Sequence, residues 1–471
     1  MAPLRISALA ALVLLAACST PRKPFEAGVL TPPAAAFERA DAASAGRAPD
    51  PFWWRGLNDP LLDALVARAT RENRDLQAAE ADLRRARAIA RLQGWTLLPS
   101  GGVGASAAVT RAGVPPRNDE LFALGADVGW EIDVFGRLRS GVRAAEADAL
   151  AVDEARRGVL VALAAETSAT YAGLRGAQAR LTAASSNVEA QEATLRLTEG
   201  LRSAGRGTRL DVARAREQLL TTRAAIAGLE AEIAAAVDSL EVLTAGLGPE
   251  LRAGLEQTAA LPAPPREFGV GAPDDLLRRR PDIRAAEARL LAASARTDAA
   301  RVDWWPRLSL LGSLSFAAGD LGRLFDGDSS GFSLGPRIDW PALDYRRNQL
   351  RLEAARAGAE AEFLRYDQSV IVGVRAVETA LANLDGAVRQ ARELSGSVQA
   401  AREASDLAAL RYREGIDPFF NVLDAQRRVA EADDRLAAAR TRETLAYVRL
   451  GQALGVGWVP SELAPVNVAL E

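Results

Sequence analysis

Residues 160–195 read LVALAAETSATYAGLRGAQARLTAASSNVEAQEATL, and they belong to a tract from Arg139 to Leu247 that contains no proline. Every seventh residue of this stretch is apolar or threonine: Leu160, Thr167, Leu174, Leu181, Val188 and Leu195. After a break at residues 203–207, SAGRG, the spacing returns with Val212, Leu219, Ile226, Ile233, Leu240 and Leu247. Sevenfold spacing over several heptads is typical of coiled coils. The tract predicts two long antiparallel helices, the first roughly 95 Å long.

Two other segments alternate apolar residues with small or polar ones, which is the period of a β-strand. They cover about 101–133 and about 308–340, and each contains two alternating runs. The intervening residues 111–120 and 318–331 contain many Gly, Pro, Asp or Ser residues, so we expect two β-hairpins closed by these loops. The predicted fold class is α+β, mainly α, with four strands in each chain.

The order of these segments occurs twice along the chain. Residues 280–290, RPDIRAAEARL, match residues 73–83, NRDLQAAEADL, at an offset of 207. A second sevenfold series follows the second strand pair: Phe363, Val370, Val377, Leu384, Ala391 and Val398. We predict a tandem duplication. The predicted parts are a first repeat at 59–248 with a long hairpin at 139–247, a Pro-rich crossover at 249–273, a second repeat at 274–458 with a long hairpin at 345–455, and a C-terminal tail at 459–471.

The first residues indicate export from the cytoplasm. Residues 1–17 have one positive charge, at Arg5, followed by a short apolar run, which is typical of a signal peptide. They end in Leu-Ala-Ala before Cys18, a pattern similar to a bacterial lipobox, in which the cysteine becomes the first mature residue and carries lipid. The alternative is an ordinary cleavage site followed by an incidental cysteine. Ser19, rather than Asp, at the next position favours sorting to the outer membrane.

Residues 18–58 are rich in Pro and Ala and end near Trp53 and Trp54. We interpret them as a lipidated N-terminal arm that lies on the body of the protein, with the two tryptophans packed down. Cys18 is the single cysteine, so a disulfide framework is excluded.

Composition excludes several classes of function. The 58 basic and 61 acidic residues nearly cancel, so nothing indicates nucleic-acid binding. Histidine, the commonest general base and metal ligand, is absent from the sequence. The sequence also lacks a Gly-rich phosphate loop and a serine nucleophile elbow. We therefore expect no enzyme activity, no metal and no cofactor other than lipid on Cys18.

Four strands cannot form a closed wall by themselves. Open sheet edges are not tolerated in a bilayer, so the strands must close through other copies of the chain. A barrel of about eight strands is filled by its own side chains, so a conducting pore needs at least three chains. The helices need the same ring, because a thin chain cannot bury their apolar faces alone.

Motifs along the mature chain carry a family resemblance. They are residues 130–137 (WEIDVFGR), 204–212 (AGRGTRLDV), 276–283 (LLRRRPDI), 411–415 (RYREG), 422–426 (VLDAQ) and 453–458 (ALGVGW). In this order, duplicated and preceded by a lipobox, they resemble the TolC/OprM/NodT family of outer-membrane efflux channel lipoproteins. The resemblance implies a homotrimer with a transmembrane β-barrel in the outer membrane and a long α-helical barrel in the periplasm. It also implies docking to a periplasmic adaptor (membrane fusion) protein and an inner-membrane pump of the proton-driven RND type, with substrates passing unchanged to the exterior.

The resemblance also suggests a gate at the two helical turns. Family carboxylates at positions matching Asp424 and Asp211 surround the periplasmic aperture, and a tyrosine matching Tyr412 latches to the Asp of the neighbouring hairpin. This sequence departs from the family at Asn421, where an Asp would double the ring charge. The alternative is local. Thr208 with Asp211 predicts a capping box, and Asp417 before Pro418 predicts an N-cap followed by a proline at the first helical position.

The same turns are the expected contact with the adaptor. Gly205 and Gly415 suit sharp reversals, since glycine adopts left-handed backbone conformations without strain. The residues expected to touch an adaptor are Arg202, Ser203, Gly205, Thr208, Arg209 and Leu210 on the first turn, and Arg413, Gly415 and Ile416 on the second. The alternative is that both turns are simply solvated.

Two other functions compete with efflux. One is a protein-secretion duct served by an ABC-driven (type I) system, against which the lipobox weighs. The other is a periplasmic coiled-coil lipoprotein that acts as a tether, which would have no need for the two strand pairs.

Overall fold

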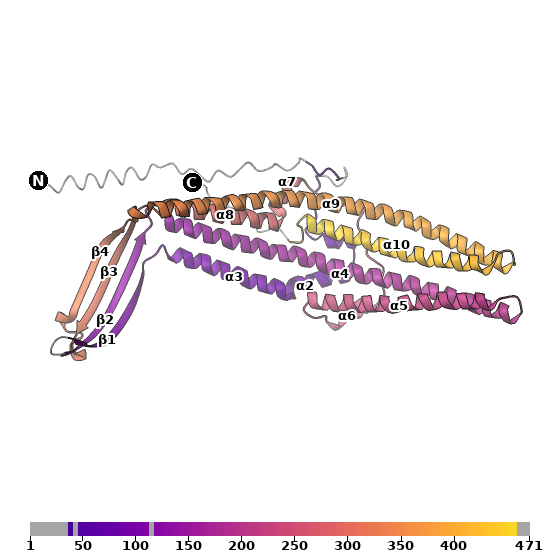
Figure 1. Cartoon of the computed structure of the whole chain (residues 1–471), viewed down its shortest axis with the longest axis horizontal. Coiled ribbons are helices and arrows are strands. Elements are labelled where there is room, and N and C mark those ends of the chain that lie inside the picture. Colours follow the sequence, from indigo (N-terminus) through magenta and orange to yellow (C-terminus); the bar gives the residue numbers. More distant parts are fainter. Residues whose placement is uncertain (1–35, 41–45, 113–116, 459–471) are drawn as a thin grey trace. The chain divides into compact units, whose positions relative to one another are not determined.

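The structure is a computed structural model that describes residues 36–40, 46–112 and 117–458 (Figure 1). The predicted signal segment, Cys18 and the C-terminal tail lie outside the described residues. The chain forms two compact units. The described part of the first falls within Ala88–Asp148 and Ala288–Asp367, and that of the second within Pro32–Arg87, Ala149–Glu287 and Gln368–Glu471.

The first unit contains one antiparallel sheet in the order β1-β2-β3-β4. Its strands are β1 (Ser100–Ala112), β2 (Arg117–Ile132), β3 (Arg307–Ala318) and β4 (Ser330–Asp339). The two predicted hairpins are therefore present, and pairing of β2 with β3 joins them. Among the described residues, β1 and β4 each pair along one side, which leaves the two outer edges of this sheet open.

The register places the apolar positions of all four strands on one face. Val103 lies opposite Ala126, and Ala126 lies opposite Leu314, which in turn lies opposite Phe332. Opposed residues of antiparallel strands point to the same side, so the alternation in the sequence becomes a continuous apolar surface. This surface is exposed, as the 85% exposure of Phe332 shows. The other face carries mostly small and polar residues, with Leu121 and Leu311 as exceptions. On it the hydroxyls of Ser313 and Ser333 lie 2.9 Å apart.

Two very long helices run through both units. They are α4 (Arg137–Ser203) and α9 (Tyr345–Arg413). Each is followed by a shorter helix, α5 (Arg209–Leu243) after α4 and α10 (Phe419–Ala453) after α9. All six residues of the predicted sevenfold series in α9 are buried. Among the described residues, no helix is both long enough and apolar enough to cross a membrane.

The remaining helices are short and fill the two repeats. The first repeat contains α2 (Pro60–Glu72) and α3 (Arg74–Trp95) before its strands, and the second contains α7 (Pro273–Arg279) and α8 (Pro281–Val302). The predicted Pro-rich crossover at 249–273 contains a helix that the sequence analysis did not predict, α6 (Pro249–Glu256). The buried guanidinium of Arg175 fixes α6 by donating to the carbonyl oxygens of Gly254 and Gln257 at 3.0 and 2.6 Å.

Two helix ends differ from the expectation. The sevenfold series predicted a helix to Leu247, but α5 ends at Leu243. The Thr244 hydroxyl donates to the Leu240 carbonyl, and Ala245 and Gly246 adopt positive φ values of 51° and 112°, which end the helix. At α10, Pro418 is the N-cap and not the first helical residue. Asp417 does not cap the helix, because its carboxylate accepts from Arg411 at 2.7 Å.

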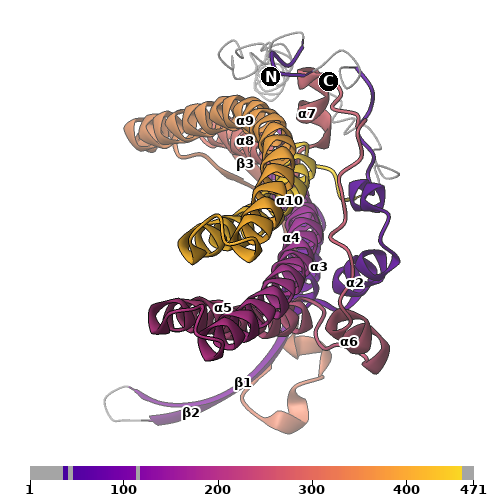
Figure 2. The same ribbon diagram turned by 90° about the vertical axis from the view of Figure 1, so that its right-hand side faces the viewer.

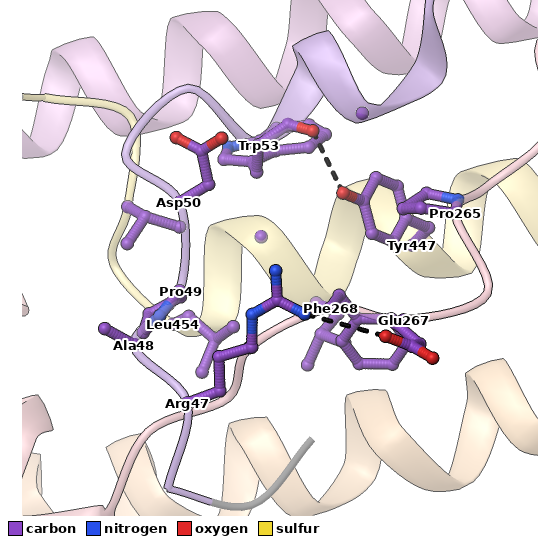
Figure 3. A pocket seen from close by; sticks show the side chains of 15 residues that line it. Arg47, Ala48, Pro49, Asp50, Trp53, Pro265, Glu267, Phe268, Tyr447 and Leu454 are labelled. Carbon is purple, nitrogen blue, oxygen red and sulfur yellow. Dashed lines mark hydrogen bonds and ion pairs between the residues drawn. The ribbon is translucent and has the colours of Figure 1, made fainter. Parts of the chain in front are cut away.

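The described end of the N-terminal arm is seated on α10, as predicted for the two tryptophans. Trp53 begins the 3₁₀ helix η1 (Trp53–Leu57) and is buried. Its carbonyl oxygen accepts from the Tyr447 hydroxyl at 2.9 Å, and the two rings pack edge to face (Figure 3). Gly451 lets the indole approach, because a Cβ there would lie 2.6 Å from the ring. A cavity of about 210 Å³ beside this seat is lined by Arg47, Glu267 and Phe268, among others.

The Gly451→Ala substitution should therefore loosen the arm. Overpacking a tight contact costs roughly 1–3 kcal/mol of stability, so the midpoint of thermal unfolding should fall. Gly386→Ala in α9 is the matched control, because nothing lies within 4 Å of its added Cβ. The control should be neutral or stabilise the helix by about 0.5–1 kcal/mol. Equal midpoints for the two variants would contradict the close approach of Trp53.

Candidate functional site at the helical turns

The turn between α4 and α5 and the turn between α9 and α10 lie near one another in the second unit (Figures 1 and 2). A small apolar cluster of Ala215, Phe419 and Val422 joins the two hairpins, with Leu195 and Tyr412 packed against it. The Tyr412 and Phe419 rings are 5.2 Å apart. The hairpins therefore touch through a few side chains just above the turns.

Each turn is closed by its own backbone. Gly205 and Gly415 have φ values of 73° and 72°, as the glycine pattern predicted. Arg206 N donates to the Leu201 carbonyl at 2.8 Å, and Ile416 N donates to the Arg411 carbonyl at 2.9 Å. These bonds satisfy carbonyl groups that would otherwise be unpaired at the helix ends. The two repeats thus build the same turn twice.

Asp211 is occupied by the capping box predicted for the start of α5. Its Oδ2 accepts from Thr208 N at 3.1 Å and from the Thr208 hydroxyl at 2.7 Å, while Asp211 N donates to Thr208 Oγ1. No hydrogen bond joins Tyr412 to Asp211 within the described chain. Burial, and secondarily the charge of Asp211, raise the pKa of Tyr412, so its hydroxyl remains a donor at neutral pH. A latch from Tyr412 to the Asp211 of a neighbouring chain stays a prediction.

Asp424 has two partners that the sequence analysis missed. Its carboxylate accepts from Arg428 Nε at 2.8 Å and from Arg427 Nη2 at 2.7 Å. These hydrogen bonds lower the pKa of Asp424, so the carboxylate stays ionised well into acid. The spacings i+3 and i+4 on one helix would have revealed both partners. A ring of Asp424 residues would therefore be neutralised by its own arginines. This weakens the attraction of the ring for cations further than the replacement of an Asp by Asn421 already does.

Asn421 lies in the first turn of α10, and its side chain hydrogen-bonds to Asp417, just before the helix. Hydrogen bonds from Arg411 and, to a smaller extent, from Asn421 lower the pKa of Asp417. Asn421 and Asp424 both keep their predicted place on the first turns of α10.

The predicted contact residues of both turns are exposed, and they combine apolar and basic side chains. Leu210 is 55% exposed and Ile416 is 62% exposed. Phe420, which the sequence analysis did not select, is 57% exposed beside the Arg214 guanidinium. Arg209 and Arg413 are also exposed, and Arg413 Nε donates to its own helix at Ala409 O. A partner that fits this surface would offer apolar and acidic side chains.

Comparison with known proteins identifies the class. Residues 65–246 and 272–456 each match the family described as outer membrane efflux protein. The two matched segments coincide with the two repeats, and together they cover most of the chain. The chain belongs to this family of outer-membrane channels, whose members are channels and not enzymes.

Individual relatives agree with this assignment. The chain is 32% identical to the outer membrane protein OprJ of Pseudomonas aeruginosa over 96% of each chain. It is 33% identical to the toluene efflux pump outer membrane protein TtgF of Pseudomonas putida, over 86% of this chain and 85% of the relative. The solved structure of the outer-membrane channel OprN superposes with a TM-score of 0.85 at 36% identity, covering 92% of this chain and 98% of OprN. The protein is an outer-membrane efflux channel, which confirms the predicted fold class, function and location.

The latch hypothesis predicts that Tyr412→Phe raises the single-channel conductance in planar bilayers, because the donor to Asp211 is lost. Asp211→Ala should raise it as well, but that variant also breaks the capping box. Thr208→Ala separates the two effects, since it removes the cap hydroxyl and keeps the carboxylate. An unchanged conductance in Tyr412→Phe would remove the latch.

Proposed function

We propose that three copies of this chain form one continuous duct through the outer membrane and the periplasm. The observation that carries the proposal is the pair of open edges at β1 and β4 in a sheet with one exposed apolar face. Unpaired backbone groups cost several kcal/mol each in hydrocarbon, so each β4 would pair with β1 of the next copy. Three chains of four strands then close a barrel of twelve, wide enough to hold water.

The partners in this proposal are a periplasmic adaptor and an inner-membrane pump of the RND type. Relatives named as outer-membrane components of efflux pumps support it, because such a component needs something to load it. The exposed apolar and basic turns of the two hairpins supply a surface for the adaptor.

The proposed cargo is small toxic compounds, such as drugs or solvents, which pass through the lumen unchanged. The relative TtgF is named for toluene efflux. The names of these relatives favour small compounds over a protein-secretion duct, and the four-stranded sheet argues against a tether.

We also propose that Cys18 carries the lipid that holds the N-terminal arm at the outer membrane. The Leu-Ala-Ala-Cys pattern and the following serine support this. Incorporation of labelled palmitate that is lost in Cys18→Ser would be the direct test.

The duct proposal predicts a trimer that conducts. Extracted from the outer membrane in mild detergent, the protein should have about three times the mass of one chain and should form ion-conducting channels in planar bilayers. The closed barrel should also resist dissociation in SDS without heating. A monomer or a non-conducting rod under these conditions would contradict the proposal.

The adaptor proposal predicts that charge reversal at the turns weakens docking. Arg209→Glu combined with Arg413→Glu should reduce cross-linking to the adaptor several-fold, because acidic partner groups would be repelled. Arg442→Glu is the matched control. Arg442 is exposed on α10 and, like Arg413, donates to the carbonyl four residues earlier, but it lies outside the turns. Cross-linking that is equal in both variants would rule out these arginines as contacts.

A further inference from the structure

A buried carboxylate in the second unit holds the beginning of the described arm. Glu378 lies on α9 and is 2% exposed. Its Oε1 accepts from Glu38 N at 2.6 Å, and its Oε2 accepts from Arg39 N at 3.2 Å. The Arg39 guanidinium lies 3.7 Å from the same oxygen, and the neighbouring Phe37 is buried at 5% exposure. Both oxygens of one side chain are thus used by the backbone of the arm.

A carboxylate that is buried on a helix and binds two backbone amides is an unusual contact. A buried charge is unfavourable unless hydrogen bonds and an opposite charge compensate it. The contacts that the structure shows for the Glu378 carboxylate in the described part of the chain all come from the arm: two backbone N–H groups and one guanidinium. Hydrogen bonds to an ionised acceptor are roughly twice as strong as neutral ones. The contact is therefore a specific clip, because an apolar side chain at this position could not bind the two amides.

The duplication shows that the helix itself does not require the carboxylate. The turns of the two repeats align at an offset of 210, which relates Gly205 to Gly415. At this offset the counterpart of Glu378 in α4 is Ser168. Ser168 is also buried, and its hydroxyl donates to its own helix at Ala164 O, 2.8 Å away. A small neutral residue fills the same place in the first repeat, where the structure shows no arm contact to that hydroxyl.

We infer that Glu378 is the positioning residue that sets the working length of the membrane tether, an inference that rests on the proposed lipid at Cys18. With the clip closed, Phe37 is 19 positions along the chain from Cys18, a maximum reach of about 65 Å. With the clip open, the next contact of the described arm is at Arg47, whose carbonyl oxygen accepts from Gly271 N at 2.8 Å. Arg47 is 29 positions from Cys18, so the maximum reach is about 100 Å. The clip therefore shortens the maximum reach of the anchor by about a third.

Hydrogen exchange of the full-length trimer in detergent tests the clip directly. In Glu378→Ala, the amides of Glu38 and Arg39 should exchange at least tenfold faster than in the natural protein. Glu378→Gln should give an intermediate rate, because its amide keeps one acceptor oxygen. Glu393→Ala, at an exposed position of α9, is the matched control and should change nothing. Equal exchange at these two amides in Glu378→Ala and Glu393→Ala would overturn the assignment.

A second measurement separates the tether from plain stability. Glu378→Ala should lower the efflux rate several-fold in the lipidated protein. In an unlipidated form, Glu378→Ala should not lower the efflux rate further. This form carries Cys18→Ser and a signal peptide that ordinary signal peptidase cleaves. The same several-fold loss in both forms would show that Glu378 supports only the helices, and would overturn the tether inference. Absence of palmitate from the natural protein would instead overturn the lipid proposal and the tether length, while the exchange result on Glu378 would stand by itself.

Discussion

Unsatisfied backbone hydrogen bonds at the two edges of the sheet are the constraint on which the rest of the protein depends. A four-stranded sheet with an exposed apolar face can neither dissolve nor enter a bilayer as an open piece. The proposed closure through other copies would satisfy the outer groups of β1 and β4 together. The tandem duplication is a compact solution, because one gene product supplies two hairpins and two helical hairpins to the same ring. The apolar register across all four strands would give the proposed ring one continuous apolar face.

The helices also leave groups uncovered within one chain, but here the groups are apolar side chains. The sevenfold series buries one narrow stripe, and several large apolar residues of the helices stay exposed, such as Leu364 at 58%. Within the second unit, specific hydrogen bonds add stability. Tyr447 of α10 holds Trp53, Arg175 holds α6, and Glu378 holds the N-terminal arm. Each of these contacts attaches a short peripheral segment to one of the hairpin helices.

The accuracy of the sequence analysis follows from the range of the forces involved. Helices and strands were predictable because their periods of seven and two are repeated many times, so no single residue decides them. The turns were predictable because Gly205, Gly415 and the Thr208–Asp211 pair act within four residues. Three features were not predictable. The end of α5 depends on a single backbone reversal at Ala245 and Gly246. Helix α6 depends on Arg175 from another helix, and the partner of Asp417 is Arg411 on the other side of a turn. The partners of Asp424 were within reach, since Arg427 and Arg428 lie on the same helix, but the family resemblance directed attention to the ring and away from the local ion pairs.

The turns also combine internal rigidity with weak mutual attachment, which is what an aperture requires. Both are closed by bonds within their own hairpin, so the hairpins can separate without breaking those bonds. Near the turns, the described contacts between the hairpins include the small cluster around Phe419 and a hydrogen bond of 2.7 Å from Gln426 to Thr194. They also include the Arg214 guanidinium, which lies 6.0 Å from the centre of the Phe420 ring. Farther along the helices, Arg180 lies 2.7 Å from Asp434 and 3.5 Å from Glu232, which joins both hairpins through one guanidinium. An ion pair between partly exposed groups tolerates small rotations better than a packed core does, because its attraction falls slowly with distance. If the turns form the predicted gate, opening would begin in the apolar cluster and pivot about Arg180, and it would depend more on packing than on the charge of Asp424.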